Sequence, residues 1–83
     1  MIRAVKVRAT ENFYILVNLE DGRTIKFDMQ FIHKEVGPVV DPLKTPEGFL
    51  KAFVRNGVIT WPSGYDIDPY FLIESGVSVE KTA

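Results

Sequence analysis

The sequence contains no cysteine, and its longest uninterrupted apolar run, residues 13–17, has five residues. The absence of cysteine excludes disulfides, thiolate metal sites and a cysteine nucleophile, and in so small a domain it favours a reducing compartment. A run of this length cannot span a bilayer, and the N-terminal residues lack the apolar stretch of a signal peptide. We therefore expect a cytoplasmic protein that does not bind a membrane.

The sequence also lacks the motifs of common catalytic and cofactor sites. His33 is the only histidine, so a His-x-x-x-His zinc site is absent, and no triad-like order of Ser, His and Asp occurs. No glycine-rich phosphate loop is present. Asp66 and Asp68, even with Asp28, are too few to hold a hard cation. We expect no catalytic residue, no metal and no cofactor, and hence a protein that is not an enzyme.

Positive and negative charges nearly cancel, since 10 Lys and Arg oppose 11 Asp and Glu for a net charge of −1. Nucleic-acid-binding domains usually have a strong basic excess, so direct contact with nucleic acid is disfavoured. A hydrophobic fraction of 46% excludes a disordered chain. The length of 83 residues fits one domain, because two separate cores would each be too small.

The first third of the chain predicts a three-stranded antiparallel meander. Apolar and polar residues alternate in three segments, which is the period of a half-buried strand. Asp21-Gly22 separates the second segment from the third, and Asp-Gly between two alternating runs is a strong hairpin signal. In this arrangement Tyr14 and Leu16 face away from the core. The three predicted strands are residues 2–8, 13–19 and 23–29.

The second half predicts short helices around a second hairpin. Thr45-Pro46 and Asp68-Pro69 each place a capping residue before a proline, which is typical of a helix start. Asn56-Gly57 favours a type I′ turn between two short strands. The predicted elements are a helical turn near residues 30–34, helices at 46–52 and 69–75, and strands at 51–55 and 58–61.

These elements predict an α+β fold, with a small antiparallel sheet made of the meander and the hairpin and with one or two short helices. Gly76 is expected to end the last helix, and Gly48 to weaken the first by about 1 kcal/mol relative to alanine. We predict a single domain over residues 1–76 and a frayed tail over residues 77–83. The predicted core residues are Phe27, Phe49, Val54, Ile59 and Trp61.

The most specific motif is Trp61-Pro62-x-Gly64-x-Asp66-Ile67, which follows the weaker pairs Asp21-Gly22 and Phe27-Asp28. With these motifs, residues 4–74 resemble the small prokaryotic family known as domain of unknown function 2442. The resemblance implies a small α+β domain, which in some members looks like an N-terminal domain joined to a helix-turn-helix. Other members are encoded beside another small uncharacterised protein, in an arrangement similar to toxin–antitoxin pairs. The family has no established catalytic residues, so the resemblance implies none here.

Two interpretations of the turn from Trp61 to Asp66 are open. In the structural one, Trp61 fills the core and the Asp66 carboxylate accepts backbone N–H bonds. In the functional one, Trp61, Tyr65 and Asp66 form a recognition surface, because aromatic residues dominate contact hot spots. The structural interpretation is favoured, because an aromatic residue after an apolar strand usually belongs to the core.

The expected function is that of a non-catalytic protein-interaction or regulatory module. A domain this small often gains stability by association, and the edge strands of an open sheet can pair with another chain. The partner is then a second copy or, as the resemblance implies, a neighbouring gene product bound in an antitoxin-like manner. The candidate interaction surface consists of Tyr14, Leu16, Tyr65, Asp66 and Phe71.

The alternative is a regulatory domain that binds a small ligand or a nucleic acid. Lys6, Arg8, Tyr14 and Lys26 all fall on the outer side of the predicted sheet. Sheets that bind single strands combine such charges with aromatic stacking. One exposed aromatic residue is few for that purpose, so a solvated face is the favoured interpretation.

Overall fold

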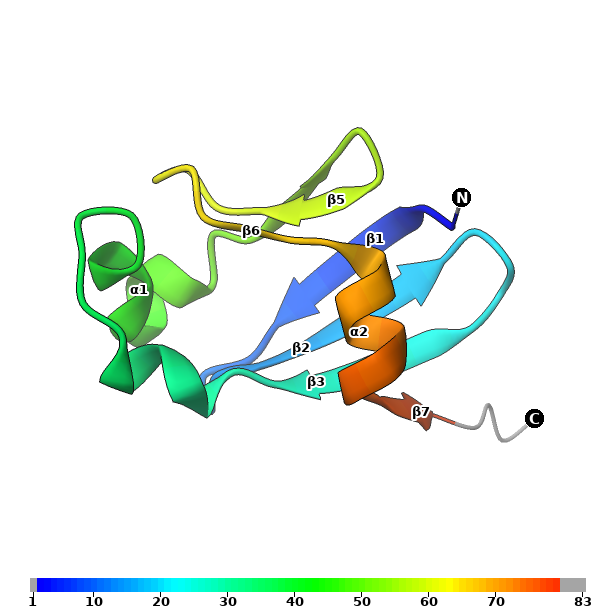
Figure 1. Cartoon of the computed structure of the whole chain (residues 1–83), viewed down its shortest axis with the longest axis horizontal. Coiled ribbons are helices and arrows are strands. Elements are labelled where there is room, and N and C mark those ends of the chain that lie inside the picture. The colour runs from blue at the N-terminus through cyan, green and yellow to red at the C-terminus, as the bar shows by residue number, and fades with distance from the viewer. Residues whose placement is uncertain (1, 80–83) are drawn as a thin grey trace.

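A computed structural model describes residues 2–79, which form two antiparallel sheets and several short helices (Figure 1). The larger sheet has the strand order β1-β2-β3-β7, and the smaller one has the order β4-β5-β6. The strands are β1 (Ala4–Ala9), β2 (Tyr14–Leu19), β3 (Thr24–Asp28), β4 (Phe53–Arg55), β5 (Val58–Thr60), β6 (Asp66–Ile67) and β7 (Val77–Val79). This confirms the predicted α+β class and the meander.

The prediction of one sheet that includes both the meander and the hairpin is wrong. One backbone hydrogen bond joins the hairpin to the edge of β1, from the amide of Ala4 to the carbonyl of Gly57 at 2.9 Å. The register of β1 against β2 shifts between Ala4 and Lys6. A bulge of this kind bends a strand and interrupts its ladder. The hairpin therefore packs against β1 as part of a second sheet.

The same bulge changes which face of β1 is buried. In a regular strand over residues 2–8, Val5 and Val7 would lie on the same side, but Val5 is 59% exposed and Ala4 is buried. An inserted residue reverses the alternation on one side of the bulge. Beyond it the pairing is regular, with Val7 opposite Val17 and Arg8 opposite Leu16.

β7 corrects the prediction of a frayed tail. Val77 lies opposite Lys26 and Val79 opposite Thr24, so residues 77–79 extend the larger sheet and the domain continues past residue 76. Three residues are too short a segment for the period of a strand to be read from sequence. Residues 80–83 of the predicted tail lie outside the described residues.

α2 lies on the inner side of the larger sheet, where it crosses in front of β2 and β3 in Figure 1, whereas α1 lies beyond one end of that sheet. The side chains of Thr45 and Asp68 accept the predicted capping bonds from the amides of Gly48 and Tyr70. The predicted helix over 46–52 is shorter, and a further turn precedes it. The helices are η1 (Gln30–Lys34), η2 (Asp41–Lys44), α1 (Pro46–Phe49) and α2 (Pro69–Ser75), where η marks a 3₁₀ helix.

Gly48 has a packing role that its helix propensity does not reveal. A Cβ atom on this residue would lie 1.8 Å from the carbonyl oxygen of Pro42. α1 therefore approaches η2 closely only because residue 48 has no side chain. The predicted cost of glycine inside a helix is outweighed here by the contact that it permits.

The core lies between the larger sheet and the layer formed by the helices and the smaller sheet. Asn56 and Gly57 have positive φ values of 52° and 79°, which confirms the type I′ turn of the hairpin. Val54 is opposite Ile59, but Val54 is half-buried, which corrects its predicted place in the core. The other predicted core residues are buried, namely Phe27, Phe49, Ile59 and Trp61.

Candidate functional site

The turn from Trp61 to Asp66 is held by the core at one end and is open at the other. Trp61 is 1% exposed, and its Nε1–H donates to the carbonyl oxygen of Phe49 at 2.8 Å. The Trp61 amide donates to the Tyr65 carbonyl, and the Gly64 amide donates back to the Trp61 carbonyl, both at 2.9 Å. The structural interpretation of Trp61 is therefore confirmed.

Asp66 does not have the structural role that its position suggested. It lies in β6 opposite Thr60 with an exposed side chain. Within residues 2–79 its carboxylate accepts no hydrogen bond, whereas the predicted role required bonds from backbone amides. The turn is closed by backbone bonds alone, so the Asp66 carboxylate is left for contact with solvent or with another molecule.

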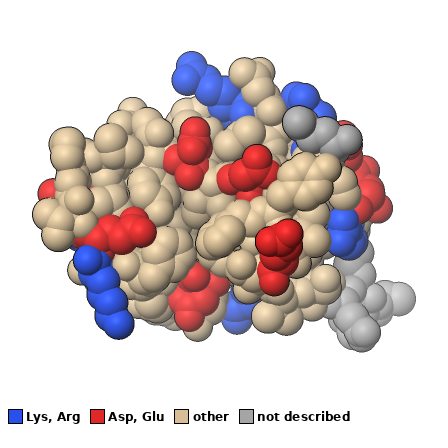
Figure 2. All heavy atoms as spheres, viewed as in Figure 1, with Lys and Arg blue, Asp and Glu red and all other residues tan. Residues whose placement is uncertain are grey.

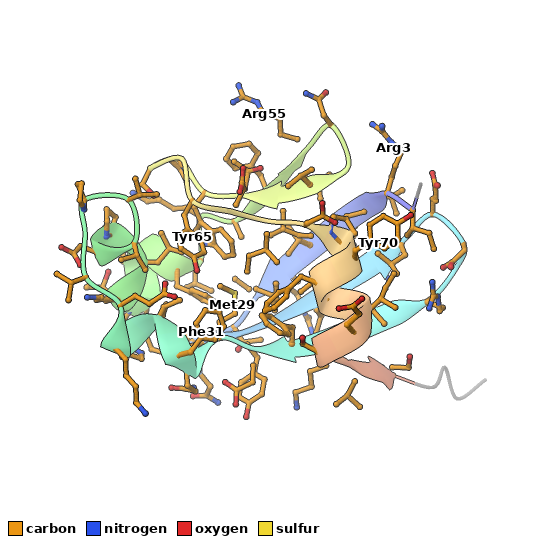
Figure 3. The ribbon with its side chains drawn as sticks, in the orientation of Figure 1. Arg3, Met29, Phe31, Arg55, Tyr65 and Tyr70 are labelled. Atoms are coloured by element: carbon orange, nitrogen blue, oxygen red, sulfur yellow. The ribbon has the colours of Figure 1, made fainter. Side chains whose placement is uncertain are left out.

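Tyr65, Asp66 and Phe71 border one groove between η1, β6 and α2. The groove has a volume of about 270 Å³, and its other side is formed by Phe31 of η1 and by Glu35, which directly follows η1. Figure 3 shows Phe31 and Tyr65 on the same side of the molecule, coming from η1 and from the turn before β6. The Tyr65 hydroxyl donates to Oε1 of Glu35 at 3.2 Å, which connects the two walls.

Negative charge dominates this groove. Burial, with a smaller contribution from the neighbouring Glu35 and Asp66 carboxylates, raises the pKa of Tyr65 to about 12. The hydroxyl is therefore neutral and remains a hydrogen-bond donor at neutral pH. Figure 2 shows acidic side chains in the middle of the face that carries α2, with several basic side chains toward its rim.

Tyr14 and Leu16 lie elsewhere, on the outer face of the larger sheet. α2 and the smaller sheet pack on the inner side, with Ile15 and Val17 facing them. A hollow of about 390 Å³ lies on the outer face, and the Lys26 ammonium stands 4.7 Å from the centroid of the Tyr14 ring. The hollow is lined by Thr10, Asn12, Tyr14, Leu16, Lys26 and Val79.

The candidate surface residues thus form two groups on different sides of the molecule. Sequence reasoning missed the contribution of β7, whose Val77 and Val79 are 67% and 41% exposed beside β3. It also missed Phe31 and Glu35 in the groove. Two valines at alternating positions are too short a pattern to predict a strand, so the first pair had little signal in the sequence. No sequence signal connects η1 to the turn that it faces.

Among the described residues, no three His, Asp or Glu side chains are grouped so as to hold a metal ion. The ring of His33 is exposed and contacts Phe13, with 4.5 Å between ring centroids. None of the helices within residues 2–79 combines the length and the apolar character that crossing a bilayer requires.

Comparison with known proteins gives one match. The model of the family described as "Protein of unknown function (DUF2442)" matches residues 4–78, which is nearly the whole chain. No curated protein and no solved structure matches the chain.

Proposed function

Since the chain belongs to the DUF2442 family, whose description states no function, we propose from its surfaces that it is a non-catalytic protein-interaction module. The observation that carries this proposal is the outer face of the larger sheet. Its apolar side chains are Leu16, which is half-buried, and Val77 and Val79, which are exposed. Apolar side chains grouped around a hollow are typical of a contact surface, whereas single exposed ones are common.

The exposed edge of β7 supports the same function. β7 pairs with β3 on one side, and within residues 2–79 no strand pairs with its other side. Unpaired backbone groups at a sheet edge accept a strand from another chain. The partner that we propose is a neighbouring gene product or a second copy of the chain, as in an antitoxin-like pair.

Sedimentation velocity at micromolar concentrations tests this proposal, with and without the purified neighbouring gene product. We expect a complex in one of the two samples, and we expect Leu16→Asp to abolish it because a charge would be buried in the contact. Leu50→Asp is the matched control, since Leu50 is 44% exposed near the end of α1 and away from this face. A chain that stays monomeric in both samples would contradict the proposal.

Nucleic-acid binding is the second candidate, because Lys6, Arg8 and Lys26 lie on the same face as Tyr14. Binding of a fluorescent single-stranded oligonucleotide, measured by anisotropy at rising salt, would favour it. Nucleic-acid affinity falls steeply with salt because counterions are released from the phosphates.

A further inference from the structure

The register of the larger sheet brings charged and apolar side chains into rows on its outer face. Arg8 lies opposite Leu16, Leu16 opposite Lys26, and Lys26 opposite Val77. Side chains of paired residues point to the same face of a sheet. Basic and apolar side chains therefore alternate in this row, which crosses β1, β2, β3 and β7.

Within the described residues Lys6, Arg8 and Lys26 form no ion pair, although this face also carries one carboxylate, Asp28, opposite Tyr14. The ion pairs of residues 2–79 lie elsewhere, between Asp21 and Arg23 and between Asp41 and Lys44. Lys6, in the neighbouring row, lies opposite Asn18 rather than an acid. Three basic side chains therefore surround apolar surface without a paired carboxylate.

We propose that this outer face binds an acidic segment of a partner protein, whose carboxylates pair with Lys6, Arg8 and Lys26 and whose apolar side chains enter the hollow beside Leu16. The inference rests on the proposed interaction function and specifies the chemistry of the partner. Complementary charge orients a partner and accelerates its association, while the apolar contact supplies affinity.

The chemistry of the face favours a protein segment over a nucleic acid. The hollow is aliphatic at Leu16 and Val79, and the Lys26 ammonium already lies over the Tyr14 ring, which is the one aromatic ring lining the hollow. Base stacking needs a free aromatic face. The net charge of −1 also lacks the basic excess of a phosphate-binding domain.

A foreign partner is also favoured over a second copy. The acidic groove at Glu35 and Asp66 lies on the α2 side of the molecule, whereas the basic face is turned the other way. Pairing one face with the other between copies would be head-to-tail, and such contacts grow into open chains unless the rotation closes a ring.

The probe for this inference is a short fluorescent peptide in which glutamate alternates with leucine, measured by anisotropy and by amide NMR. We expect saturable binding with shift changes at Tyr14, Leu16 and Lys26. The double reversal Arg8→Glu with Lys26→Glu should weaken binding by at least about tenfold. The control, Lys34→Glu with Lys51→Glu, makes the same change in net charge at exposed positions on η1 and after α1, and should weaken it by less than about threefold.

Several outcomes would overturn the inference. Equal binding of a peptide with lysine in place of glutamate, or equal weakening by both double reversals, would show non-specific attraction. Tighter binding of a single-stranded oligouridine would assign the face to nucleic acid. Self-association abolished by the Arg8 and Lys26 reversal would assign it to a second copy. If the neighbouring gene product binds and the reversals leave that affinity unchanged, this inference fails while the proposed function stands.

Discussion

Trp61 directly follows β5 of the smaller sheet and Tyr14 is the first residue of β2 in the larger sheet, and their surroundings differ. Trp61 is enclosed, its indole N–H is bonded to the Phe49 carbonyl at 2.8 Å, and its ring lies 5.6 Å from the Phe49 ring. Tyr14 is half-buried on an open face, where its polar neighbour is a lysine over the ring. Buried rings with bonded polar atoms stabilise a fold, whereas rings beside unpaired charges on an open hollow are free to contact a partner.

The largest expected effect tests this difference directly. Trp61→Ala should lower the free energy of unfolding by about 3–5 kcal/mol, because it removes the largest fully buried side chain and leaves a cavity. Tyr14→Ala is the matched aromatic control and should cost about 1 kcal/mol or less. Urea melts followed by circular dichroism measure both. Similar losses for the two variants would remove the distinction.

Gly48→Ala should have the next largest effect on the free energy of unfolding. Whether the substitution stabilises or destabilises the fold tests how closely α1 packs on η2. In most helices this substitution stabilises, but here the new methyl group would meet the Pro42 carbonyl oxygen at 1.8 Å. We expect a loss of about 1–3 kcal/mol from overpacking. Glu47→Ala, at an exposed position in the same helix, should stay within about 0.5 kcal/mol of the original chain. A stabilised Gly48→Ala variant would mean that α1 does not approach η2 closely.

A smaller difference in stability is expected between alanine variants of two neighbouring aspartates, one that caps a helix and one that is exposed. Asp68→Ala should cost about 1 kcal/mol, because its carboxylate caps α2 through the Tyr70 amide at 2.8 Å. Asp66→Ala should change stability by less than about 0.5 kcal/mol, since its carboxylate accepts no described hydrogen bond. Thermal melts of the two variants decide this, and an Asp66 loss as large as that of Asp68 would restore a structural role for Asp66.

The smallest effect concerns the ionisation of Tyr65. Its folded-state pKa of about 12 exceeds the ordinary value of 10.0, so the folded chain holds this proton more tightly. The stability that Tyr65 contributes is therefore complete below pH 10 and is lost as the pH rises toward 12. Ultraviolet titration of phenolate absorbance, with Tyr65→Phe subtracted, should give a midpoint near 12, and Glu35→Gln should lower it. A midpoint near 10 would show that the groove is open to water and carries little negative charge.

Local signals in the sequence determined the elements that depend on a few adjacent residues. Asn56-Gly57 predicted the turn because both positions adopt positive φ readily, and Thr45 and Asp68 predicted helix starts because their side chains bond the nearby amides. The burial of Trp61 followed from its place after an apolar strand. These features concern residues within a turn of one another, so no knowledge of the rest of the fold was needed.

Tertiary structure decided the features that depend on distant residues. The bulge at Val5 placed the hairpin in a second sheet, and β7 formed because β3 offered an edge to a segment with almost no strand signal of its own. The same pairing placed Val79 among the residues that line the hollow of the outer face. The sequence alone placed Tyr14 and Leu16 on the outer side of a strand. Their neighbouring side chains depend on the strand order, because adjacent strands of a sheet come from separate parts of the chain.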